Sequence, residues 1–153
     1  MSAALSLIAL SACSGLPTMW GDAEPVPVTV EQIGAAPDCR AGDRVRVFPA
    51  TDALRAWADG RGLQALVADA QPGRPHAVIA LGSEAGPVSG FAIARDALRR
   101  GGALELQASV FGSSESAAAA SPCVLVALPG PVDGDTRVRV LDSTGRLVAA
   151  TPD

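Results

Sequence analysis

Two continuous apolar runs constrain the fold of this chain more than any other feature. His76–Leu81 ends at Gly82, and Cys123–Leu128 ends at Pro129. An uninterrupted apolar run of this length between turn-forming residues is typical of a strand that is buried on both faces. His76–Leu81 is therefore predicted to be such a strand, and Cys123–Leu128 is predicted to be a second strand, which Pro129 and Gly130 end.

The remaining runs are short, and most of them alternate. Apolar residues take every second position in Arg44–Phe48 and in Ala103–Phe111, which predicts strands with one buried face. Val26–Ile33 and Phe91–Ala94 are also predicted strands. Two apolar runs on either side of Asp142–Gly145 predict a C-terminal hairpin.

One segment has helical spacing instead. Leu54, Trp57 and Ala58 fall on one side of a helix that Thr51 is expected to cap and Gly60 to end. The repeated short strands around this helix predict a β-rich fold, all-β to α+β. Its expected form is a small sandwich or barrel of about six to eight short strands with one covering helix.

The N-terminus resembles an export signal. The apolar run Ala3–Ala12 is too short for a membrane span, which takes about 20 residues, but it has the length of a signal-peptide core. Leu10-Ser11-Ala12-Cys13 resembles the lipobox of bacterial lipoproteins, in which the cysteine thiol receives a diacylglycerol. We expect residues 1–12 to be removed and Cys13 to carry a lipid that anchors the protein in a membrane. The alternative is an ordinary cysteine, because the run lacks a preceding basic residue.

The residue after Cys13 bears on the location. In lipoproteins with this motif, Asp at that position favours the inner membrane, so Ser14 suggests the outer membrane of an organism that has one. Residues 13–27 are rich in Pro and Gly and are expected to form a flexible tether. A single domain is then expected to cover residues 28–153.

Cys39 and Cys123 are the thiols that remain after Cys13. In an exported protein these two cysteines are expected to form a disulfide, which would stabilise the fold by roughly 4 kcal/mol in the chain-entropy model. The alternative is a pair of buried free thiols. The cysteine spacing indicates neither a redox site nor a zinc site.

Composition and motifs argue against nucleic-acid binding and catalysis. The formal net charge is -4, and the 12 basic residues form no block that could coat a phosphate backbone. His76 is the only histidine, and its place at the start of an apolar run favours a histidine at the entry to a strand over a catalytic base. Asp133 and Asp135, in one turn, fall short of the roughly six to eight oxygens that calcium takes. We therefore predict no enzyme activity, no cofactor and no metal site.

A loop after the first buried run is a candidate interaction site. Gly86, Pro87, Ser89, Gly90 and Phe91 form its second half, and its side chains are too small to fill a core. Surface loops on a rigid sheet often carry recognition, so we expect this loop to bind a partner. The alternative is a plain connection with Phe91 packed inward.

Four arginines are a second candidate. Arg44 and Arg46, like Arg137 and Arg139, alternate with valines and would project from one sheet face. If the two strands are neighbours, the four guanidinium groups form a patch for an acidic partner or for anionic groups of the envelope. The alternative is ordinary solubilising charge.

The order of these segments from about residue 47 to 141 resembles the C-terminal domain of the PrcB family of bacterial lipoproteins. The resemblance is carried by Leu81-Gly82, by Gly90-Phe91 where the family usually has Gly-Tyr, by Ser121-Pro122 and by Leu128-Pro129. It implies a non-catalytic domain on a secreted or lipid-anchored protein, linked to stabilising a surface protease complex.

The expected function follows from the anchor and the resemblance together. We expect a lipid-anchored protein of the bacterial cell envelope that binds or stabilises another envelope protein. The alternative is a periplasmic or surface module for a small ligand or a peptidoglycan fragment. The aromatic content of 3% counts against that alternative, because such pockets usually rely on aromatic side chains.

Overall fold

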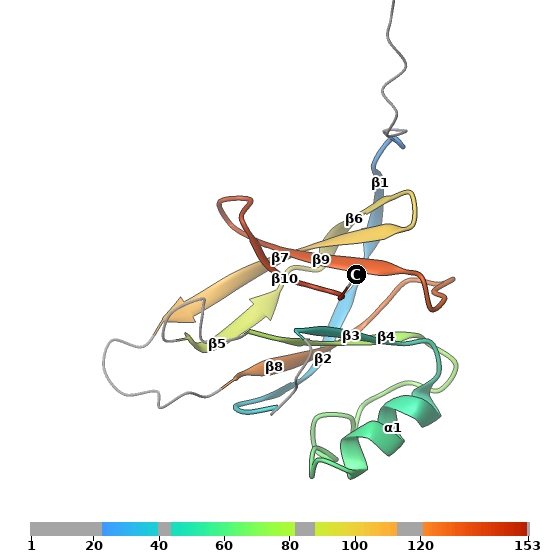
Figure 1. Ribbon diagram of the computed structural model, residues 1–153, viewed down its shortest axis with the longest axis vertical. Coiled ribbons are helices and arrows are strands. Elements are labelled where there is room, and N and C mark those ends of the chain that lie inside the picture. Colours follow the sequence, from blue (N-terminus) through green and yellow to red (C-terminus); the bar gives the residue numbers. More distant parts are fainter. Residues whose placement is uncertain (1–22, 40–43, 82–87, 113–120, 153) are drawn as a thin grey trace, which may run out of the picture.

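The computed structural model describes residues 23–39, 44–81, 88–112 and 121–152, and it shows two β-sheets and one helix (Figure 1). This arrangement confirms the predicted β-rich class as a small sandwich with one helix. The elements are, in chain order, β1 (Val26–Thr29), β2 (Glu31–Ala36), β3 (Val45–Phe48), α1 (Thr51–Asp59), β4 (His76–Ala80), β5 (Val88–Ile93), β6 (Asp96–Arg100), β7 (Ala103–Gly112), β8 (Cys123–Ala127), β9 (Arg137–Asp142) and β10 (Leu147–Ala150).

The strands form two sheets, which we call sheet A and sheet B. Sheet A has the strand order β1-β6-β7-β9-β10, and β5 also pairs with β7. Sheet B has the order β2-β8-β4-β3, so the two continuous apolar runs are its inner strands. All five residues of β4 are buried, as predicted, and all five residues of β8 are buried as well.

Sheet B separates two hydrophobic clusters because alternate side chains of a strand point to opposite faces. Ala77 and Ile79 pack between the two sheets with the inward residues of sheet A, among them Leu104 and Leu106. Val78 packs on the other face, in a cluster with Leu54 and Trp57 of α1. Each inner strand of sheet B therefore needs apolar side chains on both faces.

Helix α1 covers the outer face of sheet B. Its buried side is formed by Thr51, Leu54, Trp57 and Ala58, which matches the predicted spacing. The predicted cap was wrong: Ala50 is the N-cap residue, and no side chain caps the helix. The Thr51 hydroxyl instead donates to the carbonyl of Gln71 at 2.9 Å, which ties the helix to the turns that follow it.

Sheet A combines antiparallel and parallel pairing. Strand β7 pairs antiparallel with β5 and β6 but parallel with β9. The predicted C-terminal hairpin is confirmed, since β9 and β10 pair antiparallel and Gly145 has a φ of 81°. In its turn the Asp142 carboxylate accepts hydrogen bonds from the backbone amides of Thr144 and Arg146 at 2.9 and 3.0 Å.

The predicted strand Val26–Ile33 is divided between the two sheets. Strand β1 pairs with β6 in sheet A, and β2 pairs with β8 in sheet B. The chain crosses at Val30, whose amide donates to the carbonyl of Arg95 at 2.9 Å. The first strand of the described residues thus begins at Val26, inside the expected tether of residues 13–27.

The described residues contain ten strands, more than the six to eight expected. One of the additional strands comes from the division at Val30. The other is β6, whose sequence is Asp-Ala-Leu-Arg-Arg. Only Ala97 and Leu98 in it are apolar.

Gly34 in β2 permits a close approach between sheet B and the turns after α1. A Cβ atom at this position would clash with the carbonyl oxygen of Leu66. Because the obstacle is backbone, it cannot be relieved by a side-chain rotation.

We expect Gly34→Ala to lower the free energy of unfolding by about 1–3 kcal/mol, because strands and turns must separate to admit the methyl group. Gly90→Ala in β5 is a matched control, since a Cβ there meets nothing within 4 Å. Urea unfolding of both variants measures the difference. Equal stability of the two variants would contradict this account of Gly34.

Candidate functional site

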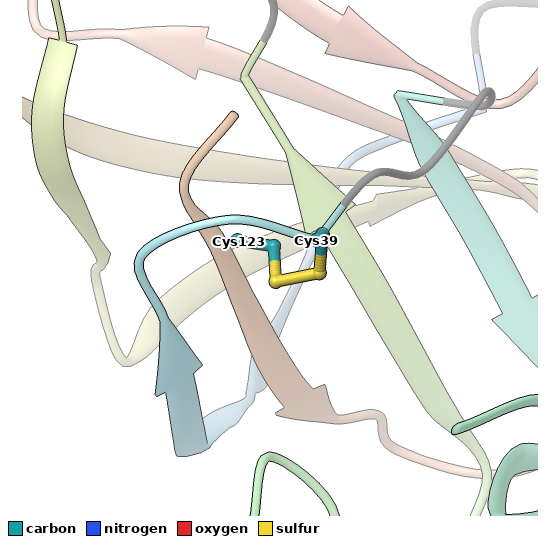
Figure 2. The surroundings of a disulfide bond; sticks show 2 residues. All are labelled: Cys39 and Cys123. Atoms are coloured by element: carbon teal, nitrogen blue, oxygen red, sulfur yellow. A yellow bond between two sulfur atoms is a disulfide. The ribbon is translucent and has the colours of Figure 1, made fainter. Parts of the chain in front are cut away.

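The disulfide predicted from the sequence is present. Cys39 and Cys123 are bonded, with their Cα atoms 5.7 Å apart, and Figure 2 shows the bond joining the segment after β2 to the start of β8. Both cysteines are buried, and the amide of Cys39 donates to the carbonyl of Ser121 at 2.9 Å. Cys123 belongs to the last backbone pair of these two strands, with Ala36. The bond therefore fastens the end of edge strand β2 to buried strand β8.

Three predicted site residues, Cys13, Gly86 and Pro87, lie outside the described residues. The lipid anchor and the first part of the interaction loop therefore stay predictions.

The other three residues of the predicted loop belong to a strand. Ser89, Gly90 and Phe91 lie in β5, which begins at Val88. The loop boundary was wrong because an irregularity in the β5–β7 register, between Val88 and Gly90, hides the alternation expected of a strand. Phe91 is 5% exposed and packs in the core between the sheets.

These strand residues nevertheless line a groove. Its volume is about 270 Å³, and it lies between β5 and the ends of β2 and β8; its lining residues are Ala35, Ala36, Pro37, Ser89, Gly90, Phe91, Pro122, Cys123 and Val124. The predicted interaction residues and the disulfide cysteine Cys123 thus meet in one place. Sequence spacing did not indicate this, because the two sets are brought together by the packing of two sheets.

The predicted arginine patch is not on one sheet face. Strand β3 is an edge of sheet B, whereas β9 lies in sheet A. Arg46 and Arg137 nevertheless line a common cavity of about 550 Å³, together with Asp135. Arg139 contacts the carboxylate of Glu105 at 3.5 Å.

In the turn at Asp133–Asp135, the Asp133 carboxylate makes hydrogen bonds within the turn. Asp133 Oδ1 accepts hydrogen bonds from the amide of Asp135 at 3.1 Å and from the hydroxyl of Thr136 at 2.9 Å. Among the residues that the structure describes, no group of three or more His, Cys, Asp or Glu side chains is placed to hold a metal ion.

His76 is the first residue of β4, the strand-entry position that its sequence context predicted, and it is fully buried. Neither ring nitrogen has a hydrogen-bond partner in the structure. Burial, followed by the positive charge of Arg74, lowers the pKa of His76 below 6.5, and the backbone carbonyl of Arg74 opposes this only in part. By the alternation of the strand, the imidazole lies on the same face of β4 as Val78, and it is not exposed to solvent.

Sequence reasoning missed a hollow on the outer face of sheet A, which we call the sheet A hollow. It has a volume of about 340 Å³ and is lined by Pro27, Val28, Thr29, Asp96, Ala97, Leu98, Glu105, Leu106, Gln107 and Leu141. Leu98 was the available signal. It neighbours the buried Ala97, so in a strand it must face outward. Because β6 was not recognised as a strand, the exposed leucine was not noticed.

The chain matches no protein-family model, no curated protein and no solved structure. The resemblance to the PrcB C-terminal domain therefore stays a prediction. No helix in the described part of the chain has the length and apolar character needed to cross a membrane.

We expect the disulfide to contribute strongly to stability. Replacing Cys39 and Cys123 together by alanine should lower the free energy of unfolding by about 2–5 kcal/mol, because the unfolded chain regains the entropy of an open loop. Urea unfolding under non-reducing conditions measures the loss, and wild type treated with reductant is the control. An unchanged urea midpoint in both samples would rule out this contribution.

Buried His76 makes stability depend on pH. Its folded pKa lies below the unfolded value of about 6.5, so the unfolded state binds more protons than the folded state as the pH falls below 6.5. The free energy of unfolding is therefore expected to decrease from pH 7 towards pH 5, and His76→Leu should flatten the curve in this range. Hydrogen bonds from Thr144 and Arg146 lower the pKa of Asp142 to about 2, so its stabilising effect is present at pH 5 to 7 and is lost only as the pH falls below about 4. The same slope in wild type and variant between pH 7 and 5 would refute the assignment.

Proposed function

We propose that this protein is a lipid-anchored component of the bacterial cell envelope whose disulfide-closed sandwich binds or stabilises another envelope protein. The lipid is carried by Cys13, and the outer membrane is the favoured location in an organism that has one. A surface protease complex is the partner class that the PrcB resemblance suggests.

The disulfide between Cys39 and Cys123 carries this proposal. Such bonds persist in the periplasm and on cell surfaces and are rare in the reducing cytosol. The disulfide agrees with the envelope location that Leu10-Ser11-Ala12-Cys13 suggests independently, because lipidation at a lipobox accompanies export.

Binding is favoured over catalysis by the position of the histidine. The sequence has one histidine and no tyrosine, and that histidine is fully buried. The described surface instead offers shallow grooves against strands, which suit contacts with another macromolecule.

One observation favours the alternative of a small-ligand module. The cavity shared by Arg46 and Arg137 has a volume of about 550 Å³, within the usual range of ligand pockets. Two guanidinium groups suit a carboxylate, which peptidoglycan fragments carry. A soluble peptidoglycan peptide that binds wild type but not Arg137→Glu would favour this function.

Replacing Cys13 with alanine should release the protein from membranes. Two or three acyl chains hold a lipoprotein firmly in a bilayer, and the variant has no thiol to receive them. Fractionation of cells that express each form measures the shift, and Ser14→Ala is the matched control because it keeps the cysteine. Intact-mass analysis of the membrane-bound wild type is expected to show acyl chains on Cys13. An unmodified Cys13 in that sample would contradict the proposal.

A further inference from the structure

The two sheets are not covered equally. Helix α1 and the turns after it pack on the outer face of sheet B, whereas no described element packs on the outer face of sheet A (Figure 1). The uncovered face is composed of the residues that alternate with the core, among them Leu98, Glu105, Gln107 and Leu141.

The sheet A hollow has an apolar floor in this face. Leu98 is 38% exposed, and its cross-strand neighbour on β1 is Pro27. Leu141 on β9 borders the hollow from the other side. When a partner covers an exposed leucine, the free energy of binding becomes more favourable by roughly 25 cal/mol for each Å² of apolar surface removed from water.

Two carboxylates line the hollow, and one of them is paired with an arginine. Asp96 and Glu105 are the two charged residues of the hollow. Glu105 contacts Arg139 at 3.5 Å, whereas none of the described hydrogen bonds or ion pairs involves the Asp96 side chain. A carboxylate next to an apolar floor is complementary to a cation carried beside an apolar side chain.

We propose that the sheet A hollow is the docking site for the partner protein, and that it receives an apolar side chain flanked by a lysine or arginine. The apolar side chain contacts Leu98, Leu141 and Pro27. The cationic side chain pairs with Asp96. This inference rests on the proposed binding function and adds the chemistry of the partner segment.

Two synthetic peptides test the chemistry directly. One acetylated pentapeptide alternates leucine with lysine, and the other alternates leucine with glutamate. Each is titrated into the full-length ¹⁵N-labelled protein in detergent, and backbone amide shifts are followed. We expect the lysine peptide to shift amides of β1, β6 and β7 around the hollow, and to bind at least about tenfold more tightly than the glutamate peptide.

Variants assign the effect to named residues. Asp96→Lys should reverse the preference between the two peptides, and Leu98→Asp should abolish binding of the lysine peptide. Two controls should leave the preference unchanged: Asp52→Lys reverses an exposed charge on α1, and Phe111→Asp removes a 53% exposed aromatic elsewhere on sheet A. Both test positions are exposed, so the variants are expected to fold.

Several outcomes would overturn the proposal. Equal affinity for the two peptides would show that Asp96 does not select the cation. Amide shifts spread over the whole surface would show non-specific association. Shifts around the hollow that grow with protein concentration, without peptide, would identify a second copy of this chain as its occupant.

Crosslinking in cells separates this inference from the proposed function. A photoreactive residue is placed at Gln107, on the rim of the hollow, or at Ser89, in the groove beside the disulfide. A crosslinked partner peptide with a basic residue next to an apolar one, obtained from position 107, supports the inference. Crosslinks to an envelope protein from position 89 alone would overturn it while leaving the proposed function intact. The absence of any crosslink at both positions would contradict both.

Discussion

The exclusion of water from both faces of β4 and β8 is the constraint on which the rest of the structure depends. Every residue of the two strands is buried, so each face needs its own apolar cover. Sheet A supplies one cover, and α1 with its following turns supplies the other. Gly34 allows the turns after α1 to lie close to sheet B, and the Thr51 hydroxyl ties α1 to those turns.

Local patterns predicted much of this architecture. The unbroken runs of β4 and β8, the helical spacing of Leu54 and Trp57, and the turn at Gly145 each depend on neighbouring residues, so they are readable in a single sequence. The bond between Cys39 and Cys123 was also predictable, because the expected export and the expected lipid on Cys13 left two cysteines to pair.

The long-range pairing of strands could not be predicted from the sequence. Nothing in the sequence of β7 indicates that it pairs parallel with β9, or that β3 and β9 lie in different sheets. Strand β6 has too few apolar residues to be recognised, and its place depends on pairing with β1 and β7. For the same reason the groove at Ser89–Phe91 and the sheet A hollow become visible only when separate strands are assembled.

The same asymmetry connects the fold with the proposed function. Both faces of sheet B are covered by packing that stabilises the fold. The outer face of sheet A is uncovered in the described structure and can serve recognition. This account requires the protein to mature in an oxidising compartment. Non-reducing peptide mapping of protein isolated from cell membranes, alkylated before lysis, tests it most directly. The account predicts one linked peptide pair that contains Cys39 and Cys123. Two alkylated free thiols at these positions would contradict it.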